Sequence, residues 1–202
     1  MAGPLFALMA GLLVSLSGTN QATARQPAPA AGQPASTSPT LGLPAQAQAA
    51  AAVIELGRAL FFERRLSAND TLSCGMCHLP EQAFTANELR TSVGMEGVSL
   101  RRNAPSLFHV GIYQSFFHDG RAASLEAQAL MPLLDPDEMA NRSLSEVVAR
   151  ASATPDMRRQ FARAFGDARI TPTRIAEALA SYQRTLVAAG SPFDRWRYGG
   201  DE

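Results

Sequence analysis

The sequence predicts an all-α domain from residue 50 to residue 202, the part of the chain that has enough large apolar side chains to form a core. Two observations support this expectation. Apolar residues recur at helical spacing in long segments, and residues that typically start or stop helices bracket the shorter ones. No run of alternating Val, Ile or Thr residues indicates a strand.

The first two expected elements are a helix and a loop. The helix covers residues 51–66, and its apolar residues fall at helical spacing: Val53, Leu56, Leu60 and Phe61. The loop extends from Cys77 to Asn103, where Pro and Gly interrupt the chain and no hydrophobic period is sustained.

Two shorter helices are expected in the middle of the domain. Ser124 can cap a helix that ends at Met131, because Pro132 has no backbone N–H with which to continue it. Ser143 and Glu146 form the capping-box pattern of a second helix, which should reach about residue 151.

The last two expected helices each begin after a Thr-Pro pair. Thr154-Pro155 precedes a helix over residues 157–165, and Gly166 is placed to end it. Thr171-Pro172 begins the longest helix, which Gly190 follows. One face of that helix carries large side chains: Ile175, Leu179, Tyr182 and Leu186.

The first 49 residues are expected to lie outside the folded domain. Residues 5–16 form an apolar run of signal-peptide length that is too short to cross a bilayer as a helix. Ala22-Thr23-Ala24 fits a cleavage site, so residues 1–24 are predicted to be a signal peptide for export to the periplasm. Residues 25–49, rich in Pro, Ala and Gln, are predicted to be a flexible linker.

The charge balance excludes some partners. The chain has 18 basic and 18 acidic residues, so neither nucleic acid nor an anionic membrane surface would be attracted to it electrostatically. No stable membrane insertion is expected once the signal peptide is removed. With three histidines and two cysteines in the whole chain, few residues are available as ligands of a metal or a haem.

Both cysteines belong to one motif, Cys74-Gly75-Met76-Cys77-His78, which is the C-x-x-C-H signature of covalent haem attachment. Two thiols three positions apart can bond to the two vinyl groups of one haem, and the adjacent imidazole can bind its iron. A disulfide would leave the histidine unexplained, and a zinc site would require ligands at finger spacing that the sequence lacks. The motif therefore predicts one haem c.

Around this motif stands an ordered series of short blocks: Glu55-Leu56-Gly57-Arg58, Leu60-Phe61-Phe62, Arg65-Leu66-Ser67, Arg102-Asn103-Ala104-Pro105-Ser106-Leu107, Asp119-Gly120-Arg121, Leu125-Glu126, Gln128-Ala129, Pro132, Glu138-Met139 and Ser191-Pro192-Phe193-Asp194. In this order, over residues 53–197, the chain resembles the N-terminal haem domain of the bacterial dihaem cytochrome c peroxidase and MauG family. The resemblance implies a cytochrome c-like fold that houses the peroxide-reacting haem.

The resemblance also assigns roles to residues. It implies that His78 is the proximal iron ligand and that Gln128 and Glu138 are distal polar residues, with Glu138 as the catalytic acid and base. Asn103 occupies the place of a calcium ligand. Family members carry a second C-x-x-C-H, which this sequence lacks. We expect either a fragment of a dihaem protein or a single-haem relative that takes electrons from a partner.

Two positions depart from the family pattern. Met95 stands where the peroxidases of the family have a displaceable distal histidine, and His118 stands where they have a tryptophan between the haems. Met95 could bind the iron, lie near an open iron, or fill space. His118 and His109 are the other candidates for a sixth ligand. Three aromatic residues are expected in the core rather than in electron transfer: Phe116, Phe117 and Trp196.

The function expected from these features is reduction of hydrogen peroxide, with electrons from a second haem domain or from a small donor such as a cytochrome c or a cupredoxin. One alternative is a mono-haem electron-transfer cytochrome in which His78 and Met95 bind the iron. A second alternative is oxidation of a partner protein in the manner of MauG.

Overall fold

The computed structural model of the protein describes residues 49–199, with the side chains of residues 49–197. The predicted signal peptide and the predicted linker up to residue 48 lie outside these residues. The described part contains helices and turns joined by loops, and no strand; only isolated bridges pair extended residues. The predicted all-α fold is therefore confirmed. None of the described helices has the length and apolar character needed to span a bilayer.

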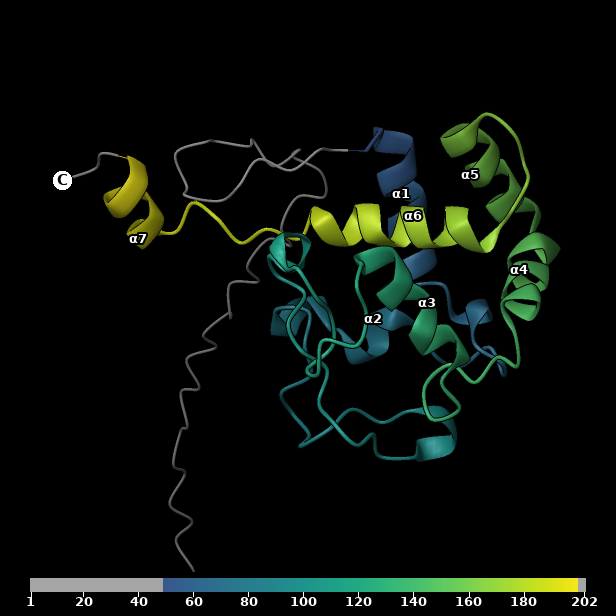
Figure 1. Ribbon diagram of the computed structural model, residues 1–202, viewed down its shortest axis with the longest axis horizontal. Helices are drawn as coiled ribbons and strands as arrows, with labels where there is room; N and C mark the ends of the chain where they lie inside the picture. The colour runs from purple at the N-terminus through teal and green to yellow at the C-terminus, as the bar shows by residue number, and fades with distance from the viewer. Residues whose placement is uncertain (1–48, 200–202) are drawn as a thin grey trace, which may run out of the picture. The chain divides into compact units, whose positions relative to one another are not determined.

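Seven helices follow one another in the described chain (Figure 1): α1 (Ala51–Phe61), α2 (Cys74–Cys77), α3 (Leu125–Leu134), α4 (Leu144–Ala153), α5 (Pro155–Phe165), α6 (Pro172–Arg184) and α7 (Pro192–Asp194). Short 3-10 turns lie at Arg64–Leu66, Pro80–Gln82, Met95–Gly97 and Val110–Ile112, and a π-helical turn lies at Arg195–Gly199. The loop predicted from Cys77 to Asn103 forms the first part of the longer segment that joins α2 to α3.

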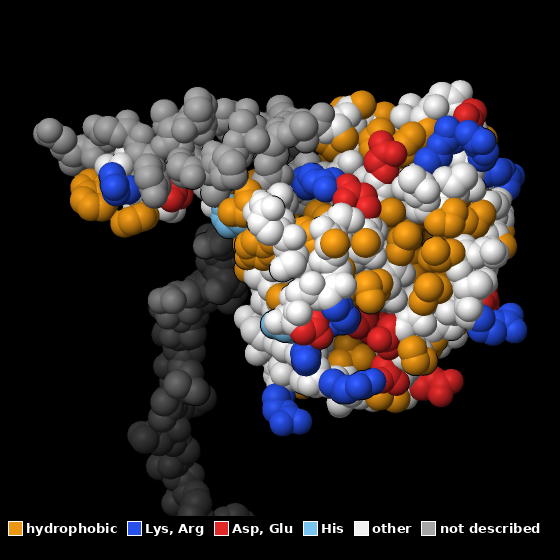
Figure 2. Space-filling model, in the orientation of Figure 1, with side chains coloured by type: hydrophobic (Ala, Val, Ile, Leu, Met, Phe, Trp, Pro, Cys, Tyr) orange, Lys and Arg blue, Asp and Glu red, His pale blue; other side chains and the backbone are white. Residues whose placement is uncertain are grey.

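Helix α6 is the central element of the core, since it packs against α1, α3 and α4 (Figure 1). Its buried residues include Ile175, Leu179 and Tyr182, as the sequence predicts, whereas Leu186, also buried, lies beyond the end of the helix at Arg184. The approach to α1 is close at Gly57, where a Cβ atom would meet the carbonyl oxygen of Ala178 at 1.9 Å. Charged side chains of both signs are interspersed over the face that Figure 2 shows, in agreement with the zero net charge.

The expected helix over residues 51–66 is shorter in the structure. Helix α1 ends at Phe61, and a separate 3-10 turn follows at Arg64–Leu66. Glu63, in an extended conformation, accepts a hydrogen bond on its side chain from the backbone N–H of Arg65 at 2.9 Å. This local cap starts a new turn and separates it from α1.

The prediction that Pro132 stops its helix is wrong. Helix α3 continues to Leu134, with Pro132 inside it. Proline removes the hydrogen bond that the carbonyl of Gln128 would otherwise accept, but the last turn is still closed by the N–H of Asp135, which donates to Met131 at 3.1 Å. Complete burial of Leu133 stabilises this turn further.

The predicted caps are largely confirmed. The hydroxyls of Ser124, Ser143 and Thr171 each accept a backbone hydrogen bond at the start of α3, α4 and α6. Gly166 ends α5 in the left-handed region with a φ of 82°. The carboxylate of Glu146 accepts from the N–H of Arg142 at 3.0 Å, so the capping box of α4 is displaced by one residue.

Candidate haem site

Cys74 and Cys77 lie at the two ends of α2, a single helical turn that follows the extended residue Ser73. Residues three apart share one side of a helix, and both cysteines line one large cavity. Gly75 lets α2 lie against the ring of Phe62, because a Cβ atom at this position would meet that ring at 2.4 Å.

The imidazole of His78 is oriented by the loop that follows it. Its Nδ1 atom donates to the backbone carbonyl of Phe84 at 2.8 Å, because a carbonyl oxygen can only accept. The loop folds back at this point, because the backbone N–H of Phe84 donates to the backbone carbonyl of Leu79 at 2.8 Å. Burial lowers the pKa of His78, while the carbonyls of Phe84 and Pro105 oppose that shift. A neutral ring held through Nδ1 keeps Nε2 free for a metal.

The cavity beside these three residues has a volume of about 620 Å³, within the roughly 300–1,000 Å³ typical of cofactor sites. Its apolar walls come from residues far apart in the sequence: Phe61, Leu72, Leu107, Val110, Phe116 and Leu179. Two free thiols, an oriented imidazole and apolar walls are what a covalently attached haem requires. The residues present therefore fit the haem that the motif predicts.

The two alternatives for the cysteines fit less well. Cys74 and Cys77 are free rather than joined in a disulfide. Burial, followed by the charge of Cys77, raises the pKa of the Cys74 thiol to about 12, and burial also raises the pKa of Cys77. Among residues 49–197, no group of three or more His, Cys, Asp or Glu side chains could hold a metal ion directly.

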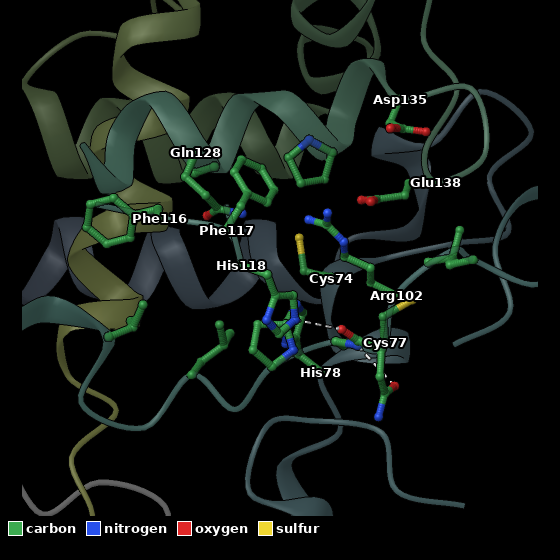
Figure 3. A pocket seen from close by; sticks show the side chains of 18 of the residues that line it. Cys74, Cys77, His78, Arg102, Phe116, Phe117, His118, Gln128, Asp135 and Glu138 are labelled. Atoms are coloured by element: carbon green, nitrogen blue, oxygen red, sulfur yellow. Dashed lines mark hydrogen bonds between the residues drawn. The ribbon is translucent and has the colours of Figure 1, made fainter. Parts of the chain in front are cut away.

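Gln128 and Glu138 line the same cavity, on the other side from His78 (Figure 3). Gln128 comes from α3, and Glu138 comes from the turn that follows this helix. Burial, followed by the charge of Asp135, raises the pKa of the Glu138 carboxyl, while Arg121 opposes the shift. The structure thus brings together all five residues predicted for haem binding and catalysis.

The turn that carries Glu138 is held by backbone groups and by one buried side chain. The N–H of Met139 donates to the carbonyl of Pro132 at 3.2 Å. The side-chain nitrogen of Asn141, which is 2% exposed, donates to the carbonyls of Leu66 at 2.7 Å and Leu133 at 2.8 Å. These bonds fix the direction from which Glu138 enters the cavity. The sequence analysis did not identify Asn141.

Arg121 completes this side of the cavity. Its guanidinium lies 3.5 Å from the centre of the Phe117 ring and forms an ion pair with Asp119 at 2.8 Å. Arg102 also pairs with Asp119, at 3.1 Å. Hydrogen bonds from Arg121, and then from Arg102, lower the pKa of Asp119 to about 2.

Met95 is buried, but it is not among the residues that line the cavity, although its neighbour Gly94 is. Its backbone N–H donates to the carbonyl of Asp137 at 2.8 Å. The loop is also close to Asp137 at Gly94, where a Cβ atom would meet the same carbonyl oxygen at 1.9 Å. This arrangement gives no support to the prediction that Met95 binds the iron.

The remaining histidines differ in position. His118 is exposed and lines the cavity, with its Nε2 atom 3.4 Å from the carbonyl oxygen of Asn103. His109 is not a lining residue, and its buried Nδ1 atom has no hydrogen-bond partner in the described structure. Of these two histidines, only His118 lines the cavity, and Figure 3 shows it on the side of His78 rather than on the side of Gln128 and Glu138.

Asn103 lines the cavity, but its amide is engaged with the backbone. Its side-chain nitrogen donates to the carbonyl of Ala86 at 2.5 Å, and its oxygen accepts from the N–H of Ala104 at 3.0 Å. The described residues place no cluster of acidic ligands around it. Calcium binding at Asn103 stays a prediction.

The structure adds one residue to the cavity that the sequence analysis had missed, and it corrects one prediction. Gln183 on α6 is 5% exposed and lines the cavity; its polarity on the buried face of the longest helix was an available signal. Trp196, expected in the core, is 61% exposed and lies beside Phe193, so that prediction is wrong. Phe116 is buried and Phe117 packs on the core, as predicted.

The sequence pattern of the family described as di-haem cytochrome c peroxidase matches residues 51–202. The chain belongs to this family. It is 44% identical over 147 residues to the methylamine utilization protein MauG of Methylorubrum extorquens, covering 72% of this chain and 41% of that protein. It is 38% identical over 146 residues to the cytochrome c551 peroxidase of Nitrosomonas europaea, covering 72% of this chain and 43% of that protein.

The solved structures agree with this assignment. A MauG-like protein associated with microbial copper homeostasis superposes with a TM-score of 0.67 and 34% sequence identity, covering 79% of this chain and 47% of that chain. The description of the family supports a haem as cofactor. The chain spans less than half the length of these di-haem cytochrome c peroxidase relatives.

Proposed function

We propose that this domain of the family is peroxidatic: it reduces hydrogen peroxide with the help of one haem bound covalently to Cys74 and Cys77, with His78 as the proximal ligand. The observation that carries the proposal is the half-buried carboxyl of Glu138, with its raised pKa, across the cavity from His78 (Figure 3). An electron-transfer cytochrome does not require an acidic group there.

The haem, when bound, supplies an iron that accepts peroxide and passes electrons to it. Cys74 and Cys77 of α2 would hold this group by two bonds, and the carbonyl of Phe84 orients the imidazole of His78. A hydrogen bond to the second nitrogen of an iron-binding histidine fixes the ring and raises its basicity.

Glu138 transfers the proton of the reaction. Its carboxylate takes a proton from the oxygen of peroxide that approaches the cofactor and returns it to the oxygen that leaves as water. Complete reduction consumes two electrons and two protons for each peroxide and releases two molecules of water. A raised pKa makes the return of the proton easier, because catalysis by an acid and a base is most efficient when the pKa is near the working pH.

Gln128 binds and orients the substrate. Its side-chain amide can donate hydrogen bonds to the oxygen that develops negative charge, in a cavity whose other walls are largely apolar. Because such a donor is already in place, it is not reorganised during the reaction.

The electrons come from a second haem domain or from a small cytochrome c or cupredoxin, and the site of action is the periplasm. The predicted signal peptide of residues 1–24 and the linker of residues 25–49 support this location. The family name supports a second haem, which this chain, with two cysteines, would have to obtain from another domain.

The substitution Glu138→Gln tests this proposal, because it preserves shape and removes the base. We expect the spectral change that follows mixing of holoprotein with peroxide, measured by stopped-flow absorbance, to slow by on the order of 10²-fold. Glu126→Gln is the matched control: Glu126 pairs with Arg184 at 2.6 Å and does not line the cavity. If Glu138→Gln reacts like the parent, the proposal is wrong.

A second candidate function is oxidation of a partner protein, which the 44% identity to a protein named MauG favours. This function would use the same residues to reduce peroxide, but the electrons would come from the partner protein instead of a second haem or a small donor. Peroxide consumption without a small donor, accompanied by oxidation of a co-purified protein, would distinguish it from the first.

A further inference from the structure

A second cavity, of about 310 Å³, adjoins the candidate haem site. Five of its lining residues also line the large cavity: Phe117, Arg121, Pro132, Asp135 and Glu138. The two spaces are therefore separated by a single layer of side chains, and Glu138 belongs to that layer.

The second cavity reaches the surface beside α3. The two residues that line it alone, Met131 and Leu134, are 40% and 37% exposed, which is high for large apolar side chains. They lie on the last turn of α3, on either side of Pro132 and Leu133. Figure 3 shows Asp135 and Glu138 together at one end of the large cavity, away from His78.

We propose that this cavity is the passage by which a small uncharged ligand, hydrogen peroxide in the proposed reaction, reaches Glu138 from solvent. The inference rests on the proposed function in one respect, which is that a haem fills the large cavity. A small ligand must then reach the distal side by a different way, and the second cavity leads from the surface to the residue that would receive it.

The chemistry of the walls suits an uncharged ligand. Asp135 and Glu138 disfavour an anion. The side chain of Arg121 is held in the wall, because it pairs with Asp119 at 2.8 Å and its guanidinium lies 3.5 Å from the centre of the Phe117 ring. The apolar opening at Met131 and Leu134 binds no charged group.

The test is to narrow the opening by substitution and to measure the binding rate of a ligand whose binding requires no proton transfer. Leu134→Trp and Met131→Trp are prepared as holoprotein, and the binding of carbon monoxide to the reduced form is followed after flash photolysis. We expect both association and dissociation to slow by about tenfold while the equilibrium constant is unchanged, because a narrowed passage hinders both directions equally. Leu134→Ala should bind as fast as the parent or faster.

Leu89→Trp is the matched control, since Leu89 is 56% exposed and lines neither cavity. The inference is overturned if Leu134→Trp and Met131→Trp bind carbon monoxide at the parental rate, or if Leu134→Ala is slower than the parent. A parent that binds no carbon monoxide would instead contradict the open iron of the proposed function. The two failures are therefore distinguishable.

Discussion

The Nδ1 atom of His78 donates a hydrogen bond to the backbone carbonyl of Phe84 at 2.8 Å. The bond joins the end of the C-x-x-C-H motif to the loop that follows it, and it sets the direction in which Nε2 points. Both Ala83 and Phe84 adopt positive φ values, 58° and 56°, to bring that carbonyl into place. The imidazole proposed as axial ligand is thus oriented by backbone geometry.

Removing both thiols should abolish covalent attachment. We expect Cys74→Ser combined with Cys77→Ser to eliminate haem staining of the denatured protein on a gel, because a hydroxyl does not form the thioether bond. Acid-acetone extraction should leave haem on the parent. Free extraction of haem from the parent would contradict the assignment of the motif.

Replacement of Met95 should have little effect on the iron. Because Met95 does not line the cavity, Met95→Leu, which keeps the volume nearly constant, should leave the visible spectrum of both redox states and the binding of carbon monoxide unchanged. A shift from a low-spin to a high-spin spectrum in this variant would show that Met95 binds the iron, and would favour the electron-transfer alternative.

The peroxide reaction should depend on pH through Glu138. Burial raises the pKa of this carboxyl above its ordinary value of 4.5, and only the deprotonated form can accept a proton. The rate constant should therefore fall as the pH is lowered through this raised pKa, and stopped-flow measurements over an acidic pH series should show the fall. Glu138→Gln should remove this limb; an identical limb in the variant would assign it to another group.

The raised pKa of Glu138 also makes the stability of the folded protein depend on pH. A carboxyl whose pKa is raised by folding favours the folded state fully below its unfolded pKa, and this contribution is lost as the pH rises through the folded pKa. Glu138→Gln should therefore unfold at a higher temperature than the parent at neutral pH. The difference should shrink in acid, which thermal denaturation followed by circular dichroism would measure.

Asn141 should be important for stability and for the site. Asn141→Ala removes two donors from buried carbonyls, of Leu66 and Leu133, and should lower the free energy of unfolding by about 2 kcal/mol. Asn87→Ala, at an exposed position, should change it little. Denaturant titration measures both. Equal stabilities of the two variants would mean that the Glu138 turn is held by its backbone bonds alone.

The sequence by itself determined what depends on near neighbours along the chain. Helix caps at Ser124, Ser143 and Thr171, and the left-handed stop at Gly166, follow from short-range hydrogen bonds and steric limits, which adjacent residues specify. The haem motif was likewise readable, because the chemistry requires two thiols and an imidazole within five residues.

Only the tertiary structure decided which distant residues share the cavity and which do not. Met95 is buried in a loop that is bonded to Asp137, and it does not line the cavity. Leu133 is fully buried, which favours continuation of α3 beyond Pro132, whereas Trp196 stays exposed beside Phe193 and apart from the core. These outcomes depend on contacts between segments far apart in sequence, and a local pattern carries no information about the packing energy that selects them.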